Sequence, residues 1–265
     1  MTRMFGLMLN DATKLHRFLV QHRSFLSPPR TVTCDGYGIG YFQDDRPLLS
    51  KKRRIEGEEQ TYDEIVSGIS TDVLLVHARD ATIGSWGTKN THPFRYSPWL
   101  LAHVGTVEGI RENRDKILES MPKFIANNVK GDTDSEVLLH YFLGKLAETT
   151  RLDNPDLQVG EVAQSLKKAV KELVPLHQLS RGRPPGTFIA TNGRLMVAYT
   201  LGIGLYMKVQ DTQPPADEDT KEAVERAFRA IMLMTAVDEK PPEECELIPD
   251  GSLVSVDRSL EVMVV

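Results

Sequence analysis

The sequence predicts one domain of the layered α/β kind, in which helices pack on both sides of sheets. Three mostly apolar runs, at 73–78, 99–104 and 194–199, have the length of strands and almost no polar alternation. Strands of this kind are covered on both faces, which calls for layers rather than an open sheet with one wet face. Amphipathic helical patterns lie around these runs. A chain of 265 residues, with 40% hydrophobic and 26% charged residues, can bury such a core.

The other elements are predicted from periodicity and turn residues. Strands are expected at 3–9 and 37–42, and helices at 14–23, 111–121, 134–149 and 159–173. The run 227–237 is expected to begin as helix from Thr220 and to change to strand near Ile231. The segment 247–265 is predicted to be a hairpin around Pro249-Asp250-Gly251. The basic run 51–54 is followed at once by glutamates, which indicates a solvated loop of mixed charge.

The helix at 134–149 has a well-marked start. Thr133 precedes it and Glu136 stands three residues later, the pattern of a capping box that satisfies free backbone donors. A core-facing stripe follows, made of Leu139, Phe142, Leu143 and Leu146.

Composition excludes several classes of function. The 32 Lys+Arg and 37 Asp+Glu give a formal net charge of −5, whereas a nucleic-acid binder needs a basic face. The longest nearly apolar stretch, 195–207, is too short to span a bilayer. No signal peptide is visible, and Cys34 and Cys245 have no paired spacing, so neither a disulfide framework nor a cysteine-rich zinc site is expected. We therefore expect a cytoplasmic protein without nucleic-acid or membrane partners.

Polar residues end the run 73–78. In a strand, His77 and Arg79 lie on one face, and Val76 and Ala78 lie on the other. An arginine at the end of a buried strand can bind a carboxylate through two parallel hydrogen bonds. A structural ion pair that closes the strand explains the same pattern, and the cluster by itself favours that explanation.

Two further residues have the chemistry of a site. Gly105 directly follows the run 99–104, and a glycine there exposes a backbone N–H of the kind that an oxyanion site requires. Asp134 begins a predicted helix, where its carboxylate can accept a hydrogen bond from a ligand amine. A turn glycine and a favourable carboxylate in a first helical turn are the plain alternatives.

The histidines do not predict a metal site. His77, His92 and His103 are spaced by 15 and 11 residues, which matches no local ligand pattern. Hydrogen-bonded structural histidines are expected instead. The glycines at 36–40 do not form a dinucleotide fingerprint, and neither a phosphate loop nor Gly-x-Ser-x-Gly occurs. We expect no metal and no cofactor.

Taken in order, the clusters resemble a known family. The motifs are Thr2-Arg-Met-Phe-Gly6, Asp35-Gly-Tyr-Gly38, His77-Ala-Arg79 with Ala81-Thr82 and Gly84, Asn90-Thr-His-Pro-Phe94, His103-Val-Gly105 and Asp132-Thr-Asp-Ser-Glu136. They resemble the class II glutamine amidotransferases of the N-terminal nucleophile hydrolase superfamily, and within it the short stand-alone branch of the ergothioneine-pathway amidohydrolases. The motifs are dense over residues 1 to about 140 and looser beyond.

The resemblance implies a fold and a site. The fold is α+β, a four-layer αββα sandwich of two stacked, mainly antiparallel sheets, formed by 1–265 as a single glutamine amidotransferase type-2-like domain. Residue 2 would become the N-terminus after removal of Met1, and its free amine, with a pKa of about 7.7–8.0, would act as base. Arg79 would hold the α-carboxylate of glutamine and Asp134 its α-ammonium. Thr82 would line the pocket, and the N–H of Gly105 would stabilise the oxyanion.

Two residues depart from the family at the reacting carbonyl. The family has Cys where this chain has Thr2, and Asn, which donates to the oxyanion, where it has Val104. Threonine is a nucleophile elsewhere in the superfamily, but it is less acidic than cysteine and depends more on its base. Loss of one oxyanion donor typically costs ~10²–10³ in turnover. The pattern suggests retained ligand recognition with altered or absent hydrolysis.

Three functions stay open from the sequence. The first is an amidohydrolase that uses Thr2 on glutamine or a γ-glutamyl amide and releases ammonia, with an ammonia-accepting partner protein as an option. The second is a non-catalytic homologue that binds a glutamine-like ligand as a regulator or partner subunit. The third is a metal-dependent hydrolase built on the histidines. The family favours the first slightly over the second.

Overall fold

The computed structural model describes residues 3–22, 36–53, 66–79, 87–175, 178–179, 182–212, 227–235 and 244–265. At Arg53, Arg79 and Thr88 it describes the backbone alone. The described residues form thirteen strands and a few helices. The strands are β1 (Arg3–Leu9), β2 (Gly36–Gln43), β3 (Arg46–Arg53), β4 (Val73–Arg79), β5 (Phe94–Tyr96), β6 (Trp99–Val104), β7 (Gly186–Thr191), β8 (Met196–Leu201), β9 (Leu205–Thr212), β10 (Phe228–Thr235), β11 (Glu246–Ile248), β12 (Leu253–Val256) and β13 (Val262–Val264). The helices are α1 (Leu15–Gln21), α4 (Arg114–Glu119), α5 (Lys123–Ala126), α6 (Asp134–Ala147) and α7 (Val159–Leu173), with 3-10 turns η1 (Ala12–Lys14) and η2 (Thr88–Asn90).

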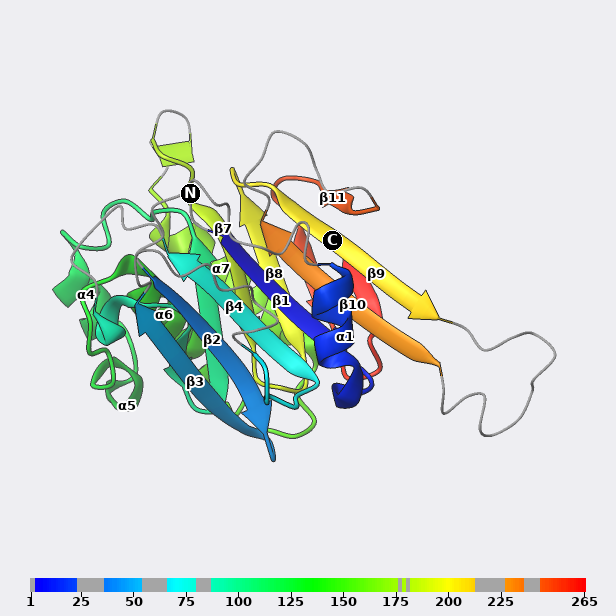
Figure 1. Cartoon of the computed structure of the whole chain (residues 1–265). Helices are drawn as coiled ribbons and strands as arrows, with labels where there is room; N and C mark the ends of the chain where they lie inside the picture. The colour runs from blue at the N-terminus through cyan, green and yellow to red at the C-terminus, as the bar shows by residue number, and fades with distance from the viewer. Residues whose placement is uncertain are drawn as a thin grey trace.

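The strands form two stacked sheets (Figure 1). The seven-stranded sheet has the order β11-β9-β10-β1-β4-β2-β3, and the six-stranded sheet has the order β13-β12-β8-β7-β6-β5. The pairs in both sheets are antiparallel. Strands from the beginning and the end of the chain therefore lie side by side, as β1 does with β10.

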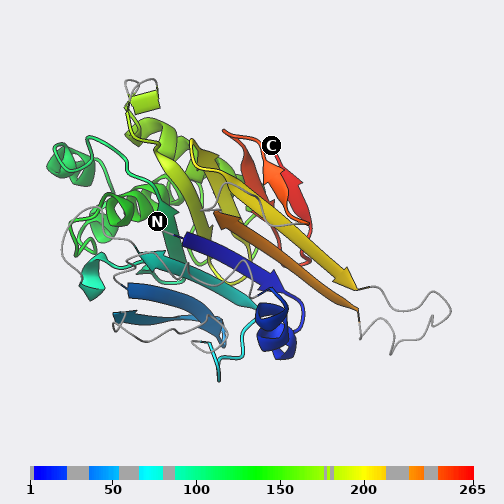
Figure 2. The ribbon, with the colours of Figure 1, turned by 45° about the horizontal axis from the view of Figure 1, so that its top comes forward.

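Three apolar clusters separate the layers. On the outer face of the seven-stranded sheet, Leu15, Phe18 and Leu19 of α1 pack in one cluster with side chains of β1, β4 and β10. A second cluster fills the space between the sheets, and a third joins the six-stranded sheet to α6 and α7. Figure 2 shows α6 and α7 in green on the opposite side of the sheets from α1 in blue. This is the predicted αββα sandwich, and the α+β class is confirmed.

Strand β6 shows why the central strands lack polar alternation. Its residues are all buried. Leu100 and Ala102 point into the cluster between the sheets, whereas Trp99 and Leu101 point into the cluster under the helices. Because both faces are covered by apolar layers, both sets of alternating positions are mainly apolar, and the one polar side chain of β6, His103, has its ring hydrogen-bonded.

Most predicted elements are confirmed. The strands at 3–9, 37–42, 73–78 and 99–104 correspond to β1, β2, β4 and β6, and the helices at 134–149 and 159–173 correspond to α6 and α7. The helix at 111–121 is shorter, as α4, and the strand at 194–199 is shifted to β8. In the run 227–237, β10 is already strand from Phe228, so the change near Ile231 was placed too late; the helix from Thr220 lies outside the described residues.

Two predictions of local structure were wrong. Within the basic run 51–54, residues 51–53 are not a loop, because they lie in β3 and pair with β2, whereas Arg54 lies outside the described residues. The turn at Pro249-Asp250-Gly251 does not close a hairpin, because β11 before it pairs with β9 in one sheet and β12 after it pairs with β8 in the other. The hairpin is formed by β12 and β13 instead. Both errors concern the choice of partner strand, which local sequence does not specify.

The start of α6 is capped in a way that the sequence predicts only in part. The Thr133 side chain accepts a hydrogen bond from the Glu136 N–H at 3.2 Å, as expected. The Glu136 carboxylate, however, accepts from the N–H groups of Lys130 and Gly131 rather than from that of Thr133. Glu136 thus fastens the loop before the helix as well as its first turn.

None of the helices among the described residues is both long and apolar enough to cross a membrane.

Gly38 of β2 offers a test of how closely the layers approach. A Cβ there would overlap the backbone carbonyl oxygen of His92, so Gly38→Ala should lower the free energy of unfolding by about 3 kcal/mol. The control is Gly160→Ala in α7, where a Cβ meets nothing within 4 Å and should be neutral or stabilise by up to about 1 kcal/mol. Urea unfolding measures both, and equal midpoints would contradict this close approach.

Candidate functional site

At one end of the sandwich the two sheets are joined through His77 of β4 and His103 of β6. Strand β4 ends beside the start of β1, since Ala78 pairs with Arg3. Strand β6 ends beside the start of β7. The His77 ring donates from Nε2 to the backbone carbonyl of His103 at 3.1 Å, which joins the end of β4 to the end of β6.

The predicted site positions follow these two histidines in the chain. Residue Arg79 is the last of β4, and Gly105 comes directly after β6. Asp134, the first residue of α6, joins them because its Oδ2 accepts a hydrogen bond from the N–H of Val107 at 2.7 Å. The fold therefore brings the backbone of Arg79, Gly105 and Asp134 to one end of the sandwich.

His103 connects three elements through its ring. Its Nε2 lies 2.8 Å from the carbonyl oxygen of Pro185, just before β7, and its Nδ1 lies 2.9 Å from the Ser135 hydroxyl in α6. The ring stacks on Phe188 of β7, with centroids 4.2 Å apart. The side chain is 2% exposed, so these hydrogen bonds are shielded from water.

The protonation of this network can be deduced from its partners. A carbonyl oxygen only accepts, so Nε2 of His103 carries a proton. Burial lowers the pKa of His103, although the nearby Asp134 charge and the hydrogen bond to Pro185 act in the opposite direction. The ring is therefore neutral at pH 7, and Nδ1 accepts the single proton of the Ser135 hydroxyl.

This proton count leaves Asp134 with unused acceptor capacity. The Ser135 hydroxyl also lies 3.2 Å from Asp134 Oδ1, but its proton is committed to His103. The carboxylate accepts from the N–H groups of Val107, at 2.7 Å, and Ser135, at 2.9 Å. Asp134 is half-buried, so its remaining lone pairs can meet a ligand.

Gly105 adopts a backbone conformation that residues with a side chain rarely adopt. Its φ is +142°, and a Cβ would overlap the carbonyl oxygen of Pro185. Gly186, with φ +120°, faces it, and a Cβ there would overlap the carbonyl oxygen of Val104. Two glycines thus let the ends of β6 and β7 approach more closely than residues with side chains would allow.

Val104 presents only apolar atoms at this end. Its side chain belongs to the cluster between the sheets and is 8% exposed. Met4, near the start of β1, belongs to the same cluster. No polar atom of residue 104 other than its backbone can therefore serve the site.

Some predicted site residues lie outside the described part of the chain. These are Thr2, Thr82 and the side chain of Arg79. The described chain just beyond residue 2 begins with β1, where Thr235 at the end of β10 accepts from the N–H of Met4 at 3.1 Å, and this threonine is 2% exposed.

The three histidines cluster, although their spacing in sequence gives no sign of it. The ring centroids of His77 and His92 are 4.1 Å apart, and those of His92 and His103 are 6.5 Å apart. Two of them make the structural hydrogen bonds described above. Within the described ranges, no group of three or more His, Cys, Asp and Glu side chains is arranged to hold a metal ion.

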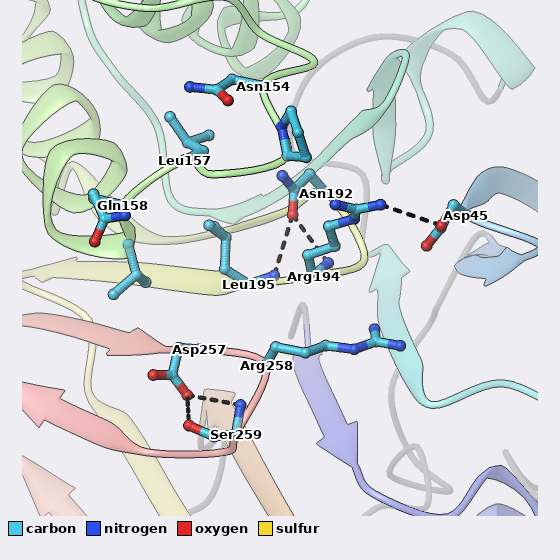
Figure 3. Close-up of a pocket in the computed structure, with 12 residues that line it drawn as sticks. Asp45, Asn154, Leu157, Gln158, Asn192, Arg194, Leu195, Asp257, Arg258 and Ser259 are labelled. Atoms are coloured by element: carbon cyan, nitrogen blue, oxygen red, sulfur yellow. Dashed lines mark hydrogen bonds and ion pairs between the residues drawn. The ribbon is translucent and has the colours of Figure 1, made fainter.

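A cavity of about 570 Å³ lies at the opposite end of the sandwich (Figure 3). It is lined by the turns after β2, β7 and β12 and by the connection between α6 and α7. Its polar groups largely bind one another: Arg194 pairs with Asp45 at 3.4 Å, and Asn192 accepts from the N–H groups of Arg194 and Leu195. These groups stabilise turns, so the end with Gly105 and Asp134 is the better candidate site.

Sequence reasoning missed residues that shape this site. Ser135 and Pro185 bind His103, and Gln178 binds the backbone beyond Gly105. Ser135 lies in the motif Asp132-Thr-Asp-Ser-Glu136, and its position next to Asp134 could have indicated that it belongs to the site. Gln178 is far from every motif in sequence, so only the tertiary structure could reveal it.

Comparison with known proteins identifies relatives by sequence. The family model described as "Glutamine amidotransferases class-II" matches residues 1–220. A protein of Saccharomyces cerevisiae described as a glutamine amidotransferase is 27% identical over 123 residues, which are 44% of this chain and 34% of that protein. A similarly described protein of Haemophilus influenzae is 26% identical over 172 residues, 62% of this chain and 51% of that protein. The matches thus span about half or less of these relatives.

Solved structures share the fold. A glutamine aminotransferase class-II domain protein from Silicibacter pomeroyi matches with a TM-score of 0.59 at 15% identity, covering 99% of this chain and 98% of that one. A structure described as that of a "predicted glutamine amidotransferase" from Pseudomonas aeruginosa matches with a TM-score of 0.57 at 16% identity, covering 99% of this chain and 95% of that one. Glutamine phosphoribosylpyrophosphate amidotransferase from Bacillus subtilis matches with a TM-score of 0.54 at 13% identity, covering 99% of this chain and 48% of that one.

The buried His103 should make stability depend on pH. Because its folded pKa lies below the ordinary value of 6.5, the unfolded chain takes up the proton first as pH falls. The stabilisation is complete above about pH 6.5 and declines as pH drops towards the folded pKa.

We expect the melting temperature to fall between pH 7.5 and 5.5, and to fall less in His103→Gln, whose amide can replace both hydrogen bonds. The exposed His16→Gln serves as control and should keep the wild-type slope. Differential scanning calorimetry across this range measures the effect. Identical slopes in wild type and His103→Gln would show that His103 is not the group responsible.

Proposed function

Because the chain belongs to the class-II glutamine amidotransferases, we propose that it binds glutamine or a γ-glutamyl amide where β4, β6 and α6 meet. One observation carries the proposal: a half-buried Asp134 with spare acceptor capacity is hydrogen-bonded to the segment that begins at Gly105. A carboxylate for an ammonium group and a backbone N–H for a carbonyl oxygen are two of the groups needed to hold an amino acid that ends in an amide.

The proposed roles follow the family resemblance residue by residue. Asp134 accepts from the α-ammonium group of the ligand, and Arg79 binds its α-carboxylate. Thr82 lines the pocket, and the N–H of Gly105 donates to the side-chain carbonyl oxygen. The network around His103 supports the role of Asp134, since it uses the Ser135 proton elsewhere and leaves lone pairs of the carboxylate oxygens free for the ligand.

The proposed reaction is amide hydrolysis by an N-terminal threonine. After removal of Met1, the Thr2 hydroxyl attacks the γ-carbonyl carbon, and its α-amine takes the hydroxyl proton. The same proton passes to the leaving nitrogen, the carbon–nitrogen bond of the tetrahedral intermediate breaks, and ammonia or an amine departs, which leaves a γ-glutamyl ester on Thr2. Water then hydrolyses the ester, which releases glutamate and restores Thr2. An ammonia-accepting partner protein would use the first product.

The pairing of strands from distant parts of the chain supports a single domain. Strand β1 pairs with β10 and β4, and the last strands β12 and β13 extend the other sheet through β8. Since both sheets combine distant parts of the chain, we propose that 1–265 form one type-2 glutamine amidotransferase-like domain.

A second function is favoured by Val104. Its apolar side chain supplies no donor to an oxyanion, and Thr2 is a weaker nucleophile than the family's cysteine. The alternative is therefore a non-catalytic homologue that keeps the ligand-binding groups and acts as a regulator or partner subunit.

Ligand binding and turnover separate the two functions. With Met1 shown to be absent by mass spectrometry, glutamine at about 100 times its Kd should stabilise the protein by about 2.7 kcal/mol in a thermal-shift assay. Arg79→Ala and Asp134→Asn should each strongly reduce this shift at the same glutamine concentration, and the remaining affinity is measured at higher concentrations. Turnover that disappears in Thr2→Ala supports the enzyme, and stabilisation without turnover supports the binding homologue. A wild-type protein that no glutamine or γ-glutamyl compound stabilises would refute both.

Restoring the oxyanion donor tests the effect of Val104. If the protein is an enzyme, Val104→Asn should raise turnover by up to about 10²–10³, at a stability cost of about 1–3 kcal/mol for the buried amide. Val104→Ala, which adds no donor, is the matched control. If the wild type is inactive, Thr2→Cys combined with Val104→Asn should create measurable glutaminase activity. Turnover that is the same in the Asn and Ala variants would show that residue 104 does not face the reacting carbonyl.

A further inference from the structure

One side chain near the candidate site makes three hydrogen bonds to backbone groups and belongs to no family motif. Gln178 is 2% exposed, and its carboxamide binds three backbone groups. Nε2 donates to the carbonyl oxygens of Thr106, at 2.5 Å, and Arg183, at 2.8 Å. Oε1 accepts from the N–H of Glu108 at 3.0 Å. Two acceptors on one side and a donor on the other fit only this orientation of the amide.

We propose that Gln178 is a positioning residue for ligand recognition, which it supports by holding the segment 105–108 against Asp134. The inference rests on the function proposed above. Its central observation is that Gln178 and Asp134 bind opposite ends of one peptide group. The carbonyl oxygen of Thr106 accepts from Gln178, and the N–H of Val107 in the same peptide group donates to Asp134.

This shared peptide group couples the two side chains. Hydrogen bonds in a chain polarise one another, and burial strengthens each of them. The orientation of the Thr106–Val107 peptide sets the direction from which Asp134 is held, and hence where its free lone pairs point. Gln178 therefore acts on the carboxylate through the backbone without touching the ligand.

The same hydrogen bonds restrain the exit from β6. The φ of Gly105 is +142°. Because glycine has only a weak preference for any one backbone conformation, contacts of the neighbouring residues must fix this one. Thr106 donates to the carbonyl of Pro184 at 3.4 Å, and Glu108 accepts from the N–H of Arg183 at 3.2 Å. Together with Gln178, these contacts fasten the segment that carries the Gly105 N–H to the segment that leads into β7.

The test replaces the carboxamide and measures both ligand and backbone. Gln178→Met keeps the length of the side chain but loses all three hydrogen bonds, and Gln178→Glu keeps only the acceptor for Glu108. We expect the affinity for glutamine to fall about fivefold in Gln178→Met, as loss of one or two net hydrogen bonds implies. Amides 106–108 should exchange with deuterium at least about tenfold faster than in the wild type, whereas those of β7 and β8 should keep their protection.

A double-mutant cycle separates positioning from general destabilisation. If Gln178 acts through Asp134, glutamine affinity in Gln178→Met combined with Asp134→Asn should equal that in Asp134→Asn alone. The control Gln158→Met makes the same change in a glutamine whose Nε2 binds only Asp156 of its own loop, and it should leave affinity and exchange unchanged. If Gln178→Met fails to fold, Gln178→Glu replaces it in both measurements.

The outcomes distinguish this inference from the proposed function. Absence of glutamine or γ-glutamyl binding by the wild type overturns the proposed function, and the positioning role falls with it. Binding by the wild type that Gln178→Met and Gln178→Glu retain at full affinity overturns the inference alone. The inference is also overturned if Gln178→Met and Asp134→Asn reduce glutamine affinity by independent factors in the double variant. An unchanged exchange rate of amides 106–108 in Gln178→Met overturns it as well.

Discussion

The candidate site depends on one buried imidazole. His103 joins the end of β6 to β4 through its backbone carbonyl, to the residue before β7 through Nε2 and to α6 through Nδ1. Because the ring is shielded from water, each of these hydrogen bonds would leave an unsatisfied polar group if it broke, at a cost of about 1–3 kcal/mol. The His103 ring thus fixes the six-stranded sheet relative to the helix that carries Asp134, and the hydrogen bond from His77 to the His103 backbone carbonyl links the two sheets. The neutral form of the His103 ring also decides how the Ser135 proton is used.

The site separates recognition from chemistry. Two of the groups proposed to hold the ligand, Asp134 and the segment beyond Gly105, are restricted to one geometry by a buried glutamine and by backbone hydrogen bonds. In the proposed reaction, the residues that differ from the family, Thr2 and Val104, act at the reacting carbonyl. Loss of a donor at residue 104 leaves the fold intact, because a valine fits the apolar cluster between the sheets. Such a protein can keep its binding groups while its turnover falls.

Local sequence predicted elements well where burial set the pattern. Strand β6 and helix α7 have the predicted bounds, since apolar layers cover both faces of the one and a single face of the other. It failed at β3, where lysines pair in an edge strand of the sheet, and at the turn between β11 and β12, whose flanking strands join different sheets. Of the site, the motifs led to Gly105 and Asp134 as candidates, but they gave no sign of Gln178 or of the histidine cluster.

The amino-acid sequence by itself determined the family, the fold class and the residue types available at the reacting end, because motifs and apolar periodicity are local properties of the chain. Only the tertiary structure decided which strands pair, which proton Ser135 shares and which distant glutamine holds the segment beyond Gly105. The physical reason is that hydrogen bonds between buried groups depend on distance and direction in space. Residues separated by 72 positions, as Thr106 and Gln178 are, can meet these requirements without leaving a signal in either local sequence.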